Sequence, residues 1–482
     1  MLKNTKLETP NLPSSYTPPP DDNKNILNPQ YELATHTVKV SRTGSVSDVT
    51  AMWGPDKPSV MKDLVSFSAA EVYGQDTVDT LATHLDRLQS REAFREQSDP
   101  NEMLQLLRLF EEPLECDLRN EGKPKGAYKW GNVDNTLLGA CILSIAEQAQ
   151  KVLINEPRLL RISSPTYTFG DFRGNFHDLV AFERLFWRLG PKCMPSNFLF
   201  LGNYVDGGDN GLEVVAYLLS QKLIAPHSFF LIRGHHEMRN VQELSTFKKE
   251  CMSKLGQVMG QKVWKAINKC FDVMPLAAVI DNKIFCAHGG FPAPYHKGGY
   301  LSEFDRIPHE LADPMKTSPL AVQVMLSEPL ADREMELVAE KKKALVESGG
   351  FLLNNTRGEG AYFFSKRALE LFLKRNGLSH MIRSDQVKEA GFQIQQNSRL
   401  LTVFSSSGYK DGTNQAACVL VDGNKLRVFR VDKNSLEKGN LFNFTFFYDM
   451  ELLTYHFINF EHFTLPALPL VINVTLIWYC DK

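Results

Sequence analysis

The sequence predicts an α/β fold in which polar groups follow the ends of the strands. Between residues 166 and 431, short apolar strands each precede a loop of Gly, Asp, Asn or His, as in PTYTFGDFRGN, FLFLGNYVDGG, SFFLIRGHHE, KIFCAHGG and RLLTVFSSSGY. Helical apolar spacing at residues 212–222 and 365–375 separates some of these strands. Because α/β folds place their sites just beyond strand ends, these endings together predict one composite site.

The composition argues against a general attraction to polyanions. The chain has 482 residues, of which 43% are hydrophobic, and its 54 basic residues nearly balance its 56 acidic residues. This balance provides no field for nucleic acid or an anionic membrane, so neither is expected as a partner. The eight cysteines are scattered without a C-x-x-C pair, and the first residues, MLKNTKLETPNLPSS, contain no apolar signal segment. We therefore expect reduced thiols in a cytoplasmic or nuclear protein.

The region before the strands divides into two predicted parts. Residues 1–57 include six prolines within the first 30 positions and few bulky apolar residues, which predicts a disordered segment, with a proline-rich docking peptide as the alternative. Residues 58–132 contain helical apolar spacing, as in LATHLDRL, which predicts a helical accessory segment. A further helix is predicted at residues 135–155, where the apolar side chains form one stripe.

The C-terminal half contains a charged insertion and an unusual tail. Residues 328–348 read as a charged, helix-like insertion, and we favour a solvated face over a localisation signal for its KKK run. Residues 434–482 form an aromatic-rich tail that ends in TLPALPLVINVTLIWYCDK. Its apolar run is about 15 residues long and includes two prolines, whereas a membrane-spanning helix needs roughly 20 apolar residues. We favour a packed or poorly structured appendage over a membrane anchor.

The order of the strand-end motifs carries a family resemblance. GDFRGN, GNYVDGG, RGHHE and HGG resemble the GDxHG, GDxVDRG, GNHE and HGG motifs of the phosphoprotein phosphatase family of metal-dependent serine/threonine phosphatases. Downstream, LSEPL, NNTRGEG, MIRSDQVKEAGF and LLTVFSSSGY resemble the later motifs of that family. The resemblance covers a domain at residues 133–433. It implies a calcineurin-like metallophosphatase fold, a central β-sandwich flanked by helices, here with a helical N-terminal extension.

The resemblance also implies a mechanism and a set of site residues. Family members use two divalent metals to activate a hydroxide, orient the phosphoryl group and neutralise its charge. By position, His236 with Asp206 matches the general acid and its orienting carboxylate. Asp171 and His288 match metal ligands. On the phosphate side, Arg357 matches a phosphate-holding arginine and Tyr409 matches a tyrosine that borders the site.

The departures from the family pattern fall mainly on metal ligands. Arg173 stands where the family has a histidine, and a guanidinium has no lone pair with which to bind a metal. Asn203 stands where an aspartate bridges both ions, and its neutral amide oxygen is a poorer ligand for hard cations. Gly207 removes a phosphate-binding arginine. For Arg173, we favour an ion pair with Asp171 over a cation that replaces the first metal and binds phosphate.

Two further departures concern the second metal. His235 replaces an asparagine and Asp385 replaces a histidine, so that with His288 they form a two-histidine, one-carboxylate set. Such a set can hold a single Mn²⁺, Fe²⁺ or Zn²⁺. A plain hydrogen bond between these residues in an inactive cleft is an equal alternative. We expect at most one divalent ion, and none remains open.

Two hypotheses about function follow. The favoured one is a pseudophosphatase that keeps the cleft, lacks the dinuclear centre and binds a phosphoprotein or a regulatory protein partner. The alternative is an active, divergent phosphoserine/phosphothreonine protein phosphatase that uses one metal ion, with Arg173 and Arg357 carrying the phosphate charge. Loss of the bridging ligand, a first-site ligand and a phosphate arginine favours the first hypothesis.

Overall fold

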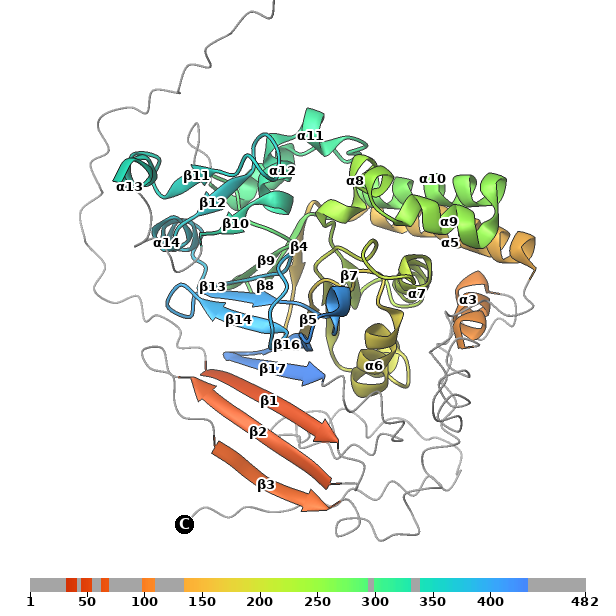
Figure 1. The fold of residues 1–482 in the computed structure, drawn as a ribbon, viewed down its shortest axis with the longest axis horizontal. Coiled ribbons are helices and arrows are strands. Elements are labelled where there is room, and N and C mark those ends of the chain that lie inside the picture. Colours follow the sequence, from red (N-terminus) through yellow and green to blue (C-terminus); the bar gives the residue numbers. More distant parts are fainter. Residues whose placement is uncertain are drawn as a thin grey trace, which may run out of the picture. The chain divides into compact units, whose positions relative to one another are not determined.

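Two β-sheets and their surrounding helices form the part of the chain that the structure describes (Figure 1). This computed structural model describes residues 32–40, 45–53, 62–68, 98–108, 134–293, 299–330 and 339–431, the first three ranges as strand backbone. The strands of the first sheet run in the order β3-β2-β1-β17-β16-β5-β6-β7. Their bounds are β1 (Glu32–Val40), β2 (Ser45–Trp53), β3 (Lys62–Ser68), β5 (Thr166–Phe169), β6 (Asn197–Phe200), β7 (Phe229–Leu231), β16 (Ala416–Asp422) and β17 (Lys425–Val431).

The second sheet has the strand order β14-β15-β13-β9-β8-β4, and a small third sheet has the order β10-β12-β11. The second consists of β4 (Leu159–Ile162), β8 (Ala277–Ile280), β9 (Ile284–Ala287), β13 (His380–Arg383), β14 (Phe392–Gln395) and β15 (Leu400–Val403). The third consists of β10 (Glu328–Pro329), β11 (Phe351–Leu353) and β12 (Tyr362–Phe364).

The α-helices are α3 (Asp99–Arg108), α5 (Asn135–Leu153), α6 (Phe176–Phe186), α7 (Gly211–Ile224), α8 (Arg239–Leu244), α9 (Phe247–Leu255), α10 (Gln257–Val273), α11 (Pro314–Thr317), α12 (Pro319–Leu326), α13 (Ala339–Glu347) and α14 (Lys366–Arg375). Short 3₁₀ helices occur at η1 (Pro191–Cys193), η2 (His235–Glu237), η4 (Leu301–Arg306) and η6 (Tyr409–Asp411). The expected helices at residues 135–155, 212–222 and 365–375 correspond to α5, α7 and α14.

Side-chain alternation along the strands sorts the core into layers. In β6, Phe198 and Phe200 join the cluster shared with α5, α6, α7, α9 and α10, whereas Leu199 joins the cluster between the two sheets. A third cluster lies between the second sheet and helices α12 and α14. Because successive strand residues point to opposite faces, each sheet is buried on both sides. The predicted sandwich with flanking helices is therefore confirmed.

The N-terminal region differs from the sequence prediction. Strands β1 and β2 lie in the segment predicted as disordered, and β3 lies in the segment predicted as helical; both predictions are wrong over these strands. The physical reason is tertiary pairing, because β1 pairs with the edge of β17 in parallel and the Thr- and Val-rich β2 pairs with β1. Helix α3 is the described helix of the accessory segment.

Several other predictions can be compared with the structure. Lys341, Lys342 and Lys343 lie exposed on α13, as a solvated face requires. The tail at residues 434–482 lies outside the described residues. Among the residues that are described, no helix is long and apolar enough to cross a membrane. The described cysteines are free thiols: five are buried and Cys193 is exposed.

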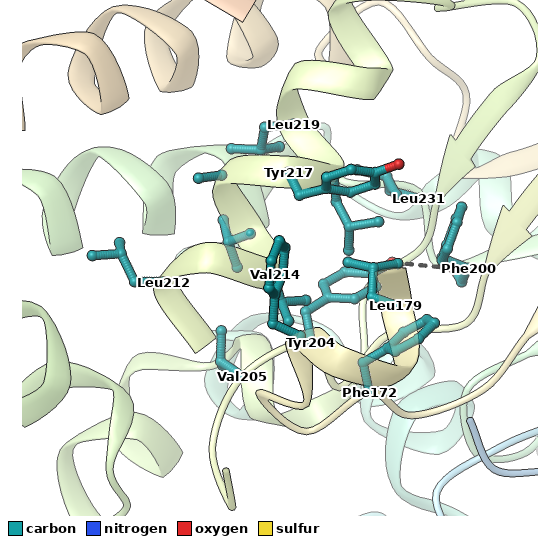
Figure 2. Packing of buried hydrophobic residues seen from close by; sticks show 14 of the residues in the cluster. Phe172, Leu179, Phe200, Tyr204, Val205, Leu212, Val214, Tyr217, Leu219 and Leu231 are labelled. Atoms are coloured by element: carbon teal, nitrogen blue, oxygen red, sulfur yellow. Dashed lines mark hydrogen bonds between the residues drawn. The ribbon is translucent and has the colours of Figure 1, made fainter. Parts of the chain in front are cut away.

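Tyr204 anchors the loop that follows β6. Its ring is 1% exposed and packs among apolar side chains of α6 and α7, as Figure 2 shows for Leu179 and Val214. Its hydroxyl lies 2.7 Å from the carbonyl oxygen of Ile232 and 3.1 Å from that of Phe200. A buried phenol that finds such partners holds its backbone firmly. The loop therefore presents Asn203 and Asp206 from a fixed base.

Candidate metal and phosphate site

The site lies where the carboxyl ends of two groups of parallel strands meet. Strands β5, β6 and β7 are parallel neighbours in the first sheet, and β9, β13 and β15 are parallel neighbours in the second. A bridge between Asp171 and Phe404 joins the two groups at this end. The loops after these strands supply every predicted site residue except Arg357, which comes from the connection between β11 and β12.

Four site residues have left-handed backbone conformations. The φ angles are 53° at Arg173, 55° at Asn203, 66° at Asp206 and 68° at Asp385. Asn and Asp tolerate this region because their short polar side chains bond locally, but an arginine there is strained. Such conformations gather at functional sites, where the surrounding structure holds them in place. Each turn directs a side chain back toward the strand ends.

Asp171 is buried and its carboxylate is surrounded by protein donors. The Oδ1 atom accepts hydrogen bonds from the Ser384 hydroxyl and from the Asp385 backbone N–H, the latter at 2.9 Å. The Oδ2 atom accepts from Arg173 Nε at 3.0 Å and from Asn203 Nδ2 at 2.7 Å. An ionised carboxylate has about four lone-pair positions, so these four donors use its acceptor capacity.

Arg173 lies between Asp171 and the ring of Tyr409. Its guanidinium carbon is 5.4 Å from the centroid of that ring, a cation–π distance, and its side chain is 11% exposed. Gly207, where the family arginine is missing, faces the same ring, because a Cβ atom there would lie 2.7 Å from Tyr409 Cε2. The ring therefore contacts both positions at which the charge pattern departs from the family.

Asn203 links the two halves of the site through both ends of its amide. Its Nδ2 donates to Asp171, and its Oδ1 accepts from the backbone N–H of His236 at 2.9 Å. The backbone N–H of Asn203 in turn donates to Glu237 Oε2 at 2.7 Å. These partners determine which amide atom is oxygen and which is nitrogen. A neutral hydrogen-bonded connector thus stands where the family has an anionic bridge.

His235, His288 and Asp385 bring three potential ligand atoms together. His235 Nδ1 lies 3.1 Å from His288 Nε2 and 3.3 Å from Asp385 Oδ1, and His288 Nε2 lies 3.6 Å from the same oxygen. All three residues are buried. A tetrahedral ion with ligands at about 2.0–2.1 Å separates them by roughly 3.3 Å, so this triangle, named here the 235/288/385 triad, has the size that one ion requires.

The polar atoms of the triad also fit a cation. Asp385 Oδ1 is buried and makes no hydrogen bond with the described residues, although its histidine neighbours are close. His288 Nδ1 lies 2.8 Å from the carbonyl oxygen of Leu201, so it carries the proton and leaves Nε2 with a lone pair toward the triad. Such a backbone partner is the usual way in which a metal-binding histidine is oriented.

Burial and charge keep the triad in a form suited to cation binding. Burial lowers the pKa of His235 well below its ordinary value, and the nearby Asp385 opposes this effect only in part. Burial by itself raises the pKa of Asp385, but the charges of His235 and Arg357 and the contact with His288 outweigh it and lower the pKa strongly. At neutral pH the triad therefore presents neutral His235 and an ionised Asp385.

The second histidine of RGHHE makes a separate pair. His236 Nδ1 lies 2.7 Å from Asp206 Oδ2, while Asp206 Oδ1 accepts from the backbone N–H groups of Thr246 and Phe247 at the start of α9. Burial lowers the pKa of His236 despite this carboxylate. Burial by itself raises the pKa of Asp206, but the bonds from His236 and the two backbone amides outweigh it and lower the pKa.

Arg357 reaches the site but is held by two carboxylates. Its Nε donates to Glu328 Oε1 at 3.0 Å, and its Nη2 contacts the same oxygen and lies 3.1 Å from Asp385 Oδ2. Its Nη1 lies 3.4 Å from His235 Nε2. The guanidinium is about one quarter exposed, at 26%. Part of its charge is therefore already neutralised before any phosphate binds.

Three residues of the site had no chemical signal of their own in the sequence prediction. Ser384 contacts Asp171, Glu328 holds Arg357, and Glu237 accepts from the backbone N–H groups of Asn203, Tyr204 and Gly234. Glu237 and Glu328 stand inside the quoted motifs RGHHE and LSEPL, which was the available clue. Ser384 was marked only by standing next to Asp385, because a serine alone carries no metal or phosphate signature.

The comparisons with known proteins agree with this arrangement. Residues 165–389 match the calcineurin-like phosphoesterase family. The chain is 31% identical over 288 residues to a protein phosphatase 2A catalytic protein of Dictyostelium discoideum, and the match covers 59% of this chain and 82% of that relative. It is 30% identical over 293 residues to serine/threonine-protein phosphatase BSL2 of Arabidopsis thaliana, covering 60% of this chain but only 27% of that longer protein.

A solved structure supports the fold independently. A protein serine/threonine phosphatase from Saccharomyces cerevisiae, similar to human phosphatase PP5, superposes with a TM-score of 0.52 at 24% identity and covers 62% of this chain and 90% of that one. The ordered motifs, the two-sheet fold and the sequence relatives all agree. The chain therefore belongs to the phosphoprotein phosphatase family of metal-dependent serine/threonine phosphatases, with a calcineurin-like phosphoesterase fold.

Proposed function

We propose that this chain is a pseudophosphatase that binds a phosphoprotein or a regulatory protein partner in the retained cleft. The observation that carries this proposal is the carboxylate of Asp171, whose oxygens are both engaged by protein donors. In the family this residue binds the first metal. Here the donors include Arg173 and the Asn203 amide, the two residues that replace metal ligands, so the substitutions and the hydrogen bonds support the same conclusion.

Electrostatics supports an absence of the first metal. A unit charge and a divalent ion about 4 Å apart repel by about 8 kcal/mol at an effective dielectric constant near 20. Arg173 is placed to impose such a repulsion, since its Nε lies only 3.0 Å from the carboxylate that the ion would need. No rotation of this side chain supplies a lone pair. A two-metal mechanism therefore lacks one of its two ions.

Recognition of a phosphate group rests on Arg173 and Arg357. Arg173 uses Nε for Asp171, and among the described residues its two terminal nitrogens make no hydrogen bond, so they remain available to phosphate oxygens. Arg357 adds charge from the opposite side, although Glu328 and Asp385 hold part of its guanidinium. Bidentate bonding to phosphate is the characteristic use of arginine. Tyr409 stacks on Arg173 and limits its motion.

The 235/288/385 triad would hold the single divalent ion that the family's metal dependence implies, with Asp385 as the anionic ligand. A bound ion would supply Lewis-acid stabilisation of phosphoryl charge. The protein itself does the rest: Leu201 orients His288, Arg173 and Arg357 hold the phosphate, and His236 faces the cleft from its bond to Asp206. The lowered pKa of His236 leaves its ring mostly neutral at pH 7, which weakens it as a proton donor.

A second candidate is an active phosphoserine/phosphothreonine phosphatase that uses one ion. The intact His236–Asp206 pair at 2.7 Å favours it, because this pair has the geometry that a general acid needs. The two candidates differ in turnover and share the one-ion limit.

Metal content and turnover test both candidates. We expect purified protein to hold at most one equivalent of Mn, Fe or Zn by mass spectrometry, to hydrolyse p-nitrophenyl phosphate barely above background, and to bind phosphopeptides in a pull-down from a peptide library. Two bound equivalents with brisk turnover would overturn the proposal. One equivalent with clear turnover would favour the active phosphatase instead.

A further inference from the structure

We propose that Asp171, a metal ligand by family position, serves in this chain as a positioning residue that holds two ligands of the 235/288/385 triad from outside. This inference rests on the proposed function, in which that triad is the only described place for an ion. Asp171 contacts neither ring of the triad by a hydrogen bond, yet its carboxylate reaches both sides of it through protein donors.

The first step is the lack of free acceptor capacity on Asp171. Ser384 and the Asp385 backbone occupy Oδ1, and Arg173 and Asn203 occupy Oδ2. All four donors belong to residues that are at most 11% exposed in their side chains or fully buried. Each bond would have to break before a cation could approach, and the freed donors would remain buried without partners.

The second step connects Asp171 to Asp385. The backbone N–H of Asp385 donates to Asp171 Oδ1 at 2.9 Å, and the hydroxyl of the preceding Ser384 donates to the same carboxylate. Asp385 has φ near 68°, a conformation that a buried turn adopts when local hydrogen bonds hold it. Asp171 thus fixes the turn from which the Asp385 side chain enters the triad.

The third step connects Asp171 to His235. Asp171 Oδ2 orients the Asn203 amide at 2.7 Å, and that amide nitrogen lies 3.4 Å from His235 Nδ1. The other end of the same amide accepts from the backbone N–H of His236 at 2.9 Å, which holds the short helix η2 that carries His235. Outer residues that orient metal ligands in this way typically change metal affinity by 10–100-fold when they are removed.

Asp178 provides a matched control. It is also a buried aspartate, at 1% exposure, and it accepts hydrogen bonds from Asn175 Nδ2 at 2.6 Å and from the Ser407 hydroxyl at 3.1 Å. These partners belong to the start of α6 and the loop after β15, and none of them is a triad residue. Asp178→Asn therefore perturbs a comparable carboxylate in the same part of the fold without changing the support of the triad.

The experiment is a Co²⁺ titration of the full chain followed by visible absorption, with Zn²⁺ competition to obtain affinities. We expect one Co²⁺ per wild-type chain. Asp171→Asn should still bind one Co²⁺ with the same band positions, because the ligands are unchanged, but 10–100-fold more weakly. Asp178→Asn should keep the wild-type affinity, and His288→Ala should lose the wild-type bands. Circular dichroism verifies that each variant is folded.

The outcomes separate this inference from the proposed function. Wild-type affinity in Asp171→Asn, or shifted bands that mark Asp171 as a ligand, would overturn the inference and leave the one-ion proposal standing. Two Co²⁺ ions per wild-type chain would overturn both, whereas no Co²⁺ at all would overturn the inference alone. If Asp171→Asn does not fold, Ser384→Ala removes one donor of the same connection and should weaken Co²⁺ binding several-fold; unchanged affinity there counts against the inference.

Discussion

Replacing Asn203 by aspartate restores the bridging residue of the family and should destabilise this protein. In the native chain, Asn203 Nδ2 donates to Asp171 Oδ2 at 2.7 Å, and both residues are fully buried. The substitution replaces this donor by a carboxylate oxygen at the same place. An attractive hydrogen bond then becomes a contact between two anions, and Arg173 Nε is the single described cationic group bonded to either of them.

The size of the effect follows from the separation. Two unit charges 2.7 Å apart repel by about 6 kcal/mol at an effective dielectric constant near 20. The variant can reduce this by binding a proton, which raises the pKa of the introduced carboxyl by roughly four units. Keeping that proton at pH 7 costs about 1.4 kcal/mol for each pH unit above the ordinary value near 4, or about 4 kcal/mol in all.

The sign of the pH dependence follows from the raised pKa. A group whose pKa is raised by folding contributes stability that is present below its unfolded pKa and lost as pH rises. The stability deficit of Asn203→Asp should therefore be small at pH 4 and grow by about 1.4 kcal/mol per pH unit between pH 5 and pH 7. Urea denaturation with chelator present, at pH 5, 6 and 7, measures this difference in the free energy of unfolding.

A matched control is Asn175→Asp, since Asn175 Nδ2 also donates to an aspartate, Asp178, at 2.6 Å. Asn175 is the N-cap of α6 and is partly exposed, so the helix terminus and solvent should offset the new charge. Its deficit should stay near or below about 1 kcal/mol. A pH-independent deficit for Asn203→Asp, or none at pH 7, would refute the reasoning about the buried connector.

Three further predictions concern the surroundings of the site. Burial raises the pKa of Glu250, which bonds Leu212 N–H and Lys254 beneath the loop after Asp206, to about 7; Glu250→Gln should therefore gain stability relative to wild type as pH rises from 5 to 8, by roughly 3 kcal/mol in denaturant titrations, and a constant difference would contradict this. Gly207→Arg should lose about 1–2 kcal/mol of unfolding free energy, because Gly207 has φ of 95° and faces the Tyr409 ring; a variant as stable as wild type would show that the loop adapts. Glu328→Gln should bind inorganic phosphate roughly three- to tenfold more tightly by calorimetry, because Arg357 regains charge; weaker binding would indicate that Glu328 mainly positions it.

Much of the site was predictable because its residues occur in short motifs. A strand followed by a fixed loop places its polar residue at the sheet edge whatever the rest of the chain does, so Asp171, Asn203, His236 and His288 could be located from spacing alone. Long-range partners could not be located in this way. Ser384 and Asp171 are 213 positions apart, and nothing near either residue indicates their hydrogen bond.

The N-terminal region shows the same limit in the fold. Residues 32–40 were predicted as disordered because their neighbourhood is rich in proline and poor in bulky apolar side chains. In the structure they form β1 against β17, a partner almost 400 residues away in the chain, with Glu32 opposite Lys425. A strand whose hydrogen bonds go to a distant edge has no local signature of that pairing.

By itself, the sequence determined the family, the order of the strands that carry the site, and the identity of the residues that replace metal ligands. Those properties reside in local spacing and in side-chain chemistry, such as the absence of a lone pair on Arg173. Only the tertiary structure decided what the replacements do together. It brought four donors onto Asp171 and left Asp385 Oδ1 without one, because buried polar groups are satisfied by whichever partners the packed fold supplies.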